Sequence, residues 1–391
     1  MARRDALQKI WSMCYLSTGG LLVYGGISIY NNNDRFYDNI LMPISRYLSA
    51  ETSHSLALTL AKYKIFPKSK FVDPPILQTK FLGKELSNPI GIAAGFDKQG
   101  EAVDGLTQMG FGFVEIGSVT PEPQPGNAKP RVFRLLEDKA IINRYGFNSD
   151  GHSKVYERLK GSINDSTALL GVNLGKNKES VDPVNDYATG IKTFGELADY
   201  VVINVSSPNT PGLRGLQEKD QLKKLLIGVK ATNESLAGKK PLLLVKLAPD
   251  LTLKERKEVA DIINKKDCQV DGLVISNTTV QRPNLLNKTH LDEDGGLSGE
   301  PLKDMSTELI RDMFKLTGGK IPIIGVGGVF TGQDAYEKIL AGASVVQIYS
   351  ALIFHGPPVI TKIKSELSEH LKLNGYKNVS EAVGRENLKK K

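Results

Sequence analysis

Cysteine is scarce in this sequence, with only Cys14 and Cys268 among 391 residues. Two cysteines so far apart provide neither a disulfide framework nor metal-ligand spacing. The five histidines form no cluster with cysteines or carboxylates, so we expect no metal site. Iron–sulfur chemistry is excluded because it needs a cysteine cluster.

The sequence also lacks basic patches interleaved with aromatic residues. The net charge is +8, but the basic residues are scattered, and the short clusters at 223–224 and 389–391 contain no aromatics. We therefore expect no nucleic-acid partner. An excess of basic residues is equally compatible with a protein that lies against anionic lipid. The 40% hydrophobic content and 38 glycines indicate a folded chain with many tight turns.

Charged side chains are absent from residues 10–30, which follow a basic leader containing Arg3 and Arg4. As a helix this run would span about 32 Å, against a hydrocarbon core of about 30 Å, so we predict a single-pass transmembrane anchor. The alternative is a cleaved targeting peptide, but the run has no small-x-small cleavage site. Because Asp34 and Asp38 follow the run, the positive-inside rule places the rest of the chain across the membrane from its amino terminus.

The segment after the anchor contains two short amphipathic patterns within residues 36–63. Their apolar residues are Leu41, Met42, Ile44, Tyr47 and Leu48 in one, and Leu56, Leu58, Leu60 and Ile65 in the other. Such helices either pack on the domain or lie in the lipid interface and line an entrance from it. We divide the chain into an anchor (1–31), a helical entrance segment (32–66) and a barrel domain (67–391).

Short β-branched apolar runs alternate with helical patterns through the rest of the chain. Apolar strands alternating with helices predict a parallel sheet buried on both faces, and eight such units favour a closed (β/α)8 TIM barrel. The predicted strands are 89–94, 113–119, 169–174, 200–205, 242–247, 272–276, 322–326 and 345–349. Residues 132–143 predict an inserted β-hairpin, and 360–371 predict a final helix that ends before Gly375.

Polar residues gather at the C-terminal ends of these strands, where such barrels build their active sites. Three asparagines, at 173, 204 and 277, follow or end different strands. Lys246 lies in the otherwise apolar run Leu-Leu-Leu-Val-Lys-Leu, and a buried ammonium needs an anionic partner or loses its proton. We interpret this convergence as an active site.

Glycines around the seventh strand indicate the kind of ligand. Gly299, Gly327 and Gly328 lie near this strand, and Tyr349 and Ser350 end the eighth. Loop amides in this place bind phosphate in many barrels. With no metal site expected, spacing alone predicts a barrel enzyme with an organic phosphate cofactor.

Long motifs from about residue 35 onward resemble the class 2 dihydroorotate dehydrogenases. They are residues 88–105, 111–120, 142–148, 171–177, 204–213, 271–280, 295–302 and 321–328. The resemblance implies FMN-dependent oxidation of (S)-dihydroorotate to orotate in de novo pyrimidine biosynthesis, with ubiquinone as acceptor. With the basic leader, it also implies a monomer in the mitochondrial inner membrane, its catalytic domain on the intermembrane-space side.

The resemblance further implies where FMN lies, which is across the barrel mouth. The matching positions are Ala93, Ala94, Gly95, Ser118, Asn173, Asn204, Lys246, Ser276, Gly299, Gly327, Gly328, Tyr349 and Ser350. Lys246 would lie near the flavin N1–C2 carbonyl region, where a cation stabilises the negative charge gained on reduction.

Substrate-binding residues follow from the same resemblance. They are Lys98, Asn143, Arg144, Tyr145, Gly146, Phe147, Asn204, Asn209, Asn277 and Thr278. Ser207 matches the general base that removes the C5 proton while a hydride leaves C6. Because a serine hydroxyl is a very weak base, it needs a relay, for which Thr210 is a candidate. On the residues alone, the alternative is that Ser207 only bonds the following turn.

The electron exit is implied to be a quinone tunnel, since no second dinucleotide motif favours a nicotinamide-linked exit. Met42, His54, Arg134 and Tyr349 match tunnel positions, and Pro43 and Leu56 would add apolar wall. A soluble class 1-like enzyme using fumarate would instead have cysteine at position 207 and no anchor. A tethered binding barrel without catalysis would purify without flavin colour.

Overall fold

Eight parallel strands form a closed barrel in the computed structural model, which describes residues 2–162, 168–287 and 289–388. Around the barrel the order is β10, β12, β13, β3, β4, β7, β8, β9. The bounds are β3 Ile90–Ile92, β4 Phe113–Val119, β7 Leu169–Leu174, β8 Tyr200–Asn204, β9 Leu242–Leu247, β10 Gly272–Ile275, β12 Ile323–Val326 and β13 Val345–Ile348. Each lies within two residues of a predicted strand, so the (β/α)8 prediction is confirmed.

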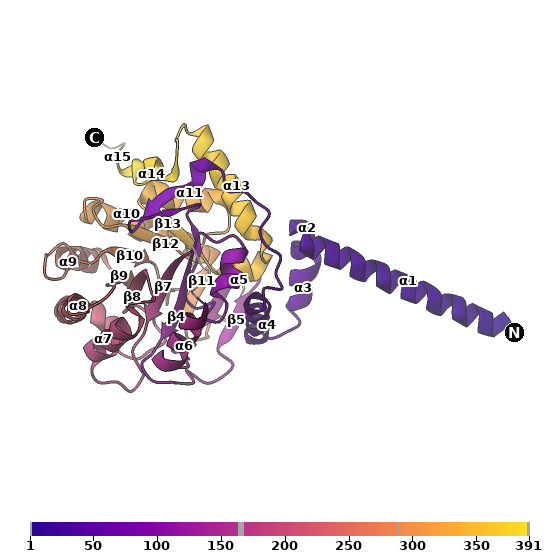
Figure 1. Ribbon diagram of the computed structural model, residues 1–391, viewed down its shortest axis with the longest axis horizontal. Helices are drawn as coiled ribbons and strands as arrows, with labels where there is room; N and C mark the ends of the chain where they lie inside the picture. Colours follow the sequence, from indigo (N-terminus) through magenta and orange to yellow (C-terminus); the bar gives the residue numbers. More distant parts are fainter. Residues whose placement is uncertain (1, 163–167, 288, 389–391) are drawn as a thin grey trace.

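Helices surround the strands and bury their outer faces (Figure 1). They are α5 Val103–Gln108, α6 His152–Ser162, α7 Pro183–Phe194, α8 Lys219–Glu234, α9 Leu253–Ile263, α10 Lys303–Leu316, α11 Gly332–Ala341, α12 Ser350–His355, α13 Pro358–Leu373, α14 Val379–Ala382 and α15 Arg385–Leu388. The predicted apolar face of α13, from Ile360 to Leu371, is fully buried. Gly375 follows that helix at φ +75°, a conformation that glycine adopts without strain.

Two small sheets lie outside the barrel. The predicted hairpin is β5 Val132–Leu135 and β6 Ala140–Asn143, and β11 Gly296–Gly299 pairs with β6 as a third, unpredicted strand. A second hairpin, β1 Thr79–Phe81 with β2 Lys84–Leu86, was also not predicted. Its Phe81 packs against Phe113 with ring centroids 6.3 Å apart, below the inner layers of the barrel. Single helical turns are η2 Pro75–Leu77, η4 Leu213–Gln217 and η5 Glu300–Leu302.

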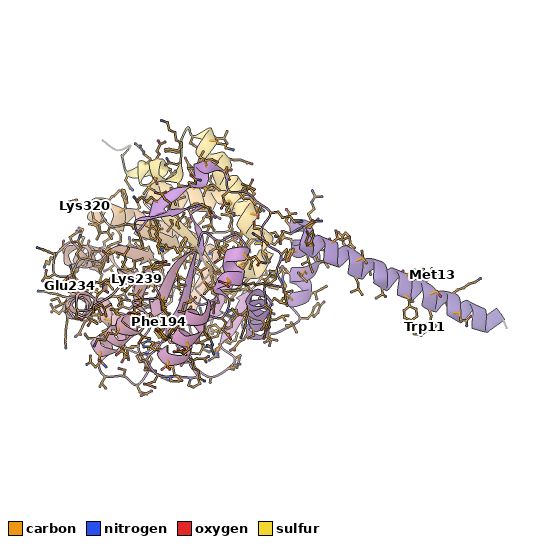
Figure 2. All side chains as sticks on the ribbon, viewed as in Figure 1. Trp11, Met13, Phe194, Glu234, Lys239 and Lys320 are labelled. Atoms are coloured by element: carbon orange, nitrogen blue, oxygen red, sulfur yellow. The ribbon has the colours of Figure 1, made fainter. Side chains whose placement is uncertain are left out.

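Helix α1 projects from the rest of the molecule as a rod (Figure 1). The amino-terminal elements are α1 Ala2–Tyr30, α2 Asp34–Phe36, the π-helical turn η1 Tyr37–Leu41, α3 Met42–Ser45 and α4 Ala50–Lys62. Within α1, the stretch Gln8–Tyr30 is long and apolar enough to cross a membrane, and nearly all of it is exposed. Figure 2 shows Trp11 and Met13 on this rod, far from the barrel. Bilayer lipid would bury such side chains.

Helix α4 belongs to the barrel rather than to the rod. Ala61 is fully buried, and a Cβ on Gly105 of α5 would lie 1.9 Å from the Ala61 carbonyl oxygen. Only glycine allows this approach of the two helices. On the other side, Leu56 of α4 and Ile44 of α3 are 48% and 59% exposed. One face of the segment therefore packs on the domain, and the other offers apolar surface next to the rod. Contact of this surface with lipid stays a prediction.

Candidate functional site

A cavity of about 330 Å³ opens at the C-terminal ends of the barrel strands. Its walls come from seven strand ends, from the β5–β6–β11 sheet and from the segment between η1 and α4. Ligand pockets commonly enclose about 300–1,000 Å³. One continuous space therefore joins the barrel mouth to the helices that follow the rod.

Of the predicted site residues, Arg144, Asn173, Pro43 and the relay candidate Thr210 do not line this cavity, and all the others do. Arg144 does not contact it: the guanidinium bonds Glu293 at 2.5 Å and lies 4.7 Å from the centre of the Phe133 ring. Its expected substrate contact stays a prediction, and here the side chain braces the loop before β11. Asn173 lies one layer deeper, because its neighbours Ser118 and Asn204 cover it.

A chain of side-chain amides connects the barrel interior to the cavity. The Asn173 Nδ2 donates to Glu115 at 2.9 Å, and Asn204 Nδ2 donates to the Asn173 Oδ1 at 3.0 Å. Asn277 Nδ2 then donates to the Asn204 Oδ1 at 3.1 Å. A carboxylate only accepts, so Glu115 fixes which end of each amide faces the next. The three predicted asparagines thus form one oriented network.

Glu115 is fully buried at the centre of the barrel and was missed by sequence reasoning. Besides Asn173 it accepts from Gln347 Nε2 at 2.8 Å and from the Tyr200 hydroxyl at 3.2 Å. Its negative charge also acts on Lys246. The sequence predicted that Lys246 needs an anionic partner but did not identify Glu115 as that partner. Burial lowers the pKa of Lys246, and the Glu115 carboxylate partly raises it again.

Lys246 Nζ has no hydrogen-bond acceptor among the described residues, although its side chain is only 6% exposed and lines the cavity. A buried ammonium without an acceptor is costly, and a polar or anionic ligand in the cavity would supply the missing acceptor.

We expect Glu115→Gln to shift the pH profile of flavin reduction by substrate. Without the carboxylate, burial lowers the pKa of Lys246 further, so the lysine loses its proton at a lower pH. The rate should then fall off at a lower pH than in the parent protein. Tyr200→Phe removes one donor to Glu115 but keeps the charge, and should retain the parental profile. Identical profiles for Glu115→Gln and the parent would show that Glu115 does not act on Lys246.

The end of the cavity near β12 and β13 has the features of an anion site. Gly299, Gly327 and Gly328 have φ of +104°, +117° and +69°. A Cβ on Gly299 would lie 2.2 Å from the Lys139 carbonyl oxygen, and one on Gly328 within 2.6 Å of the Lys303 backbone. Across the described chain, no acceptor takes the backbone N–H of Gly327, Gly328 or Ser350. Free amides around a concavity bind phosphate oxygens.

The opposite end is polar and contains a partly buried lysine, Lys98. Lys98 Nζ donates to Asn148 at 2.7 Å and lies 3.0 Å from the centre of the Tyr145 ring. Burial and the nearby Arg131 keep the pKa of Lys98 well below its usual value, and Glu51 offsets this in part. A substrate carboxylate beside Lys98 would favour its charged form.

Ser207 lines the cavity between these ends and is 6% exposed. Its Oγ accepts from the Asn209 backbone at 3.3 Å, so the contact with the following turn exists. No acceptor for the hydroxyl proton of Ser207 occurs in the described part of the chain. Thr210, the predicted relay, has a buried hydroxyl without a hydrogen-bond partner there. The two do not bond each other directly, so the relay stays a prediction.

The N-terminal part of the cavity is mainly apolar. Met42 and Leu60 line it, while His54 of α4 faces the Phe96 ring at 5.2 Å, and its Nδ1 accepts from the Tyr145 hydroxyl, 3.4 Å away. Burial and the charge of Lys98 lower the pKa of His54 to about 4, so the ring is neutral at physiological pH. Its Nε2 then donates to the Phe96 carbonyl at 2.7 Å.

Arg134 closes the outer rim of the cavity. Its guanidinium donates to the Leu48 carbonyl, which ties β5 to the turn before α4. Burial and the neighbouring Arg46 lower the pKa of Arg134. Leu48, whose side chain is 41% exposed, lies at this rim. The opening is thus apolar with cationic groups beside it.

Fold and site together define a (β/α)8-barrel enzyme whose cavity has free backbone amides at one end, a polar pocket with a partly buried lysine at the other and an apolar opening beside a membrane-length helix. A family model described as dihydroorotate dehydrogenase matches residues 76–371. The chain therefore belongs to the dihydroorotate dehydrogenase family.

Individual relatives agree with this assignment. The chain is 50% identical to the mitochondrial dihydroorotate dehydrogenase (quinone) of Mus musculus, over 98% of this chain and 99% of that protein. It is 46% identical to the dihydroorotate dehydrogenase (quinone) of Parvibaculum lavamentivorans, over 88% and 96% of the two chains. The crystal structure of the Eimeria tenella DHODH with ferulenol superposes with a TM-score of 0.83 at 43% identity, over 87% of this chain and 96% of that one.

Proposed function

We propose that this chain oxidises (S)-dihydroorotate to orotate with FMN as cofactor and ubiquinone as electron acceptor. The observation that carries the proposal is the single cavity with free backbone amides, a polar pocket with a partly buried lysine and an apolar opening. The named relatives are dihydroorotate dehydrogenases that use quinone. No cysteine occupies position 207, which is serine here, so the fumarate-using alternative is not favoured.

The residues present fit FMN in particular. The free amides of Gly327, Gly328 and Ser350 suit a terminal phosphate, and the acceptor-free ammonium of Lys246 suits the carbonyl and nitrogen edge of an isoalloxazine ring. When bound, FMN accepts the hydride from the substrate and passes the electrons on to quinone. We assign the cofactor contacts to the cavity-lining residues predicted from the sequence, with Asn173 supporting Ser118 and Asn204 from below.

The chain's own groups orient the substrate and remove its proton. Asn143 and Asn209 bond each other at 3.2 Å, and Asn277 and Thr278 line the same cavity. Amides offer both donors and acceptors, as the edge of a pyrimidine dione requires. Lys98 would hold the carboxylate. Ser207 Oγ would take the C5 proton while passing its own hydroxyl proton to a relay, for which Thr210 is the candidate.

The experiment that tests this function uses the purified full chain without oxygen. Dihydroorotate should bleach the flavin absorbance completely and release one orotate per flavin, and acid should then release FMN rather than FAD. A protein that purifies without flavin would support the tethered binding barrel instead. A flavin that other reductants bleach but dihydroorotate does not would remove the substrate assignment.

We further propose that the chain is a monomer of the mitochondrial inner membrane, with its barrel in the intermembrane space. The exposed apolar stretch Gln8–Tyr30, the basic leader before it and the mitochondrial relatives support this. Protease added to mitochondria with a ruptured outer membrane should therefore digest the barrel, whereas intact mitochondria should protect it. Protection in both preparations would place the barrel on the matrix side.

A further inference from the structure

Lys338 of α11 is a fully buried lysine whose ammonium contacts only neutral oxygens. Its Nζ donates to the hydroxyl of Ser306, to the hydroxyl of Thr307 at 2.9 Å and to the Lys303 carbonyl at 3.3 Å. Among the described residues no carboxylate lies within ion-pair distance of it. The nearby Asp334 is paired with Lys303 at 3.2 Å. A buried charge of this kind is costly unless an anion lies close by.

The ammonium lies directly behind the Gly327–Gly328 turn. Ser306, which accepts from Lys338, also bonds the Gly327 carbonyl at 3.1 Å. A Cβ on Gly327 would lie 3.0 Å from that same hydroxyl. One side of the turn therefore faces the cavity with free backbone N–H groups, and the other faces the buried ammonium. The backbone N–H groups and the Lys338 ammonium therefore both contribute positive electrostatic potential on the cavity side of the turn.

The pKa of Lys338 should depend on whether the Gly327–Gly328 turn binds an anion. Burial lowers the pKa of Lys338 to about 7, against the raising effects of Asp334, Asp304 and Glu337 and with a further lowering by Lys303. At neutral pH the group is thus only partly protonated. A dianion on the cavity side of the turn would favour the protonated form.

We propose that Lys338 is a positioning residue for the cofactor phosphate, acting through the Gly327–Gly328 turn as a buried counter-charge. It does not touch the phosphate, which the loop amides hold. This inference rests on the assignment of FMN in the proposed function. It assigns a ligand-dependent role to a lysine that the chemistry on dihydroorotate does not use.

The test is a competition between FMN and riboflavin, which lacks the phosphate. Full-length protein is equilibrated with a mixture of both flavins, and the bound ratio is measured after rapid separation. Lys338→Met should lower the bound FMN-to-riboflavin ratio by at least about tenfold, the effect of one lost charge interaction. Lys364→Met is the matched control, because Lys364 is equally buried but paired with Asp73 at 2.7 Å, away from the cavity. It should leave the ratio unchanged.

An unchanged ratio in Lys338→Met would overturn the proposal, because a merely structural lysine affects both flavins alike. If that variant fails to fold, the parent protein decides the matter. Above about pH 7 the phosphate is already a dianion, so any further pH dependence comes from the protein. The FMN-to-riboflavin ratio should fall between about pH 7 and pH 9 as Lys338 loses its proton, and a flat ratio would contradict the proposal. If the parent binds neither flavin, the proposed function fails instead.

Discussion

Ser207→Ala should retain its flavin but reduce it with dihydroorotate at least about a hundredfold more slowly than the parent, because general bases typically contribute two to four orders of magnitude. The serine lines the cavity, and its hydroxyl proton is not engaged by the described residues. Ser207→Cys should keep part of the activity, with an earlier rise in the pH profile because a thiol titrates lower than a hydroxyl. Stopped-flow absorbance under substrate excess measures both variants.

The neighbouring serine provides the control for this prediction. Ser206 is fully buried, does not line the cavity and bonds the side chains of Asn204 and Asn277. Ser206→Ala removes the same atom and two hydrogen bonds, and should slow the reaction by no more than about thirtyfold, the usual worth of two such bonds. A parental rate in Ser207→Ala would show that the serine only bonds its turn.

Lys246→Met should either release the flavin or lower its reduction potential by about 30 mV or more, which corresponds to a tenfold change for a two-electron couple. The physical reason is the loss of a buried positive charge from the side of the ring that gains negative charge. Spectroelectrochemical titration of the bound flavin gives the value.

A second buried lysine serves as the control for Lys246. Lys176 lies at the same end of the barrel, but its ammonium is held by the carbonyls of Asn177, Lys178 and Ser180 and does not line the cavity. Lys176→Met should change stability without changing the potential. A flavin-replete Lys246→Met protein with the parental potential would refute the electrostatic role.

The barrel could be predicted from the sequence because its strands are short apolar runs with no competing periodicity. The strands that were missed carry weaker signals. β11 reads Gly-Leu-Ser-Gly and has no alternating pattern, and its pairing with β6 joins residues far apart in the chain. The β1–β2 hairpin has three residues on each strand, too few for a period to show.

The site was predictable to the level of which strand ends meet, but not to the level of which side chains reach the cavity. Arg144 follows Asn143 directly, yet its side chain points to Glu293, and no sequence pattern separates the two. Glu115 could have been found, because it is a single charged residue in the otherwise apolar run 113–119, the same signal that identified Lys246. A buried charge in one barrel strand predicts a partner in another.

The sequence of α4 also did not predict that this helix has two apolar faces with different contacts. The amphipathic pattern predicted a single apolar face for α4. In the structure α4 has two, one packed against α5 and one around the entrance. Gly105 makes the difference, since its missing side chain lets α4 approach α5 closely. That contact lies outside any local pattern.

The central claim is that dihydroorotate reduces the flavin at the barrel mouth and that quinone oxidises it through the entrance beside α4. Stopped-flow measurement of the two half-reactions in Arg134→Ala tests it most directly. Arg134 holds the rim of the entrance through Leu48 and lies apart from the polar pocket around Lys98. Reoxidation by a short-tailed ubiquinone should slow by about tenfold or more, while reduction by dihydroorotate stays within about twofold of the parent. Equal slowing of both half-reactions, or reoxidation of the parent by fumarate or NAD⁺ as fast as by quinone, would contradict the account.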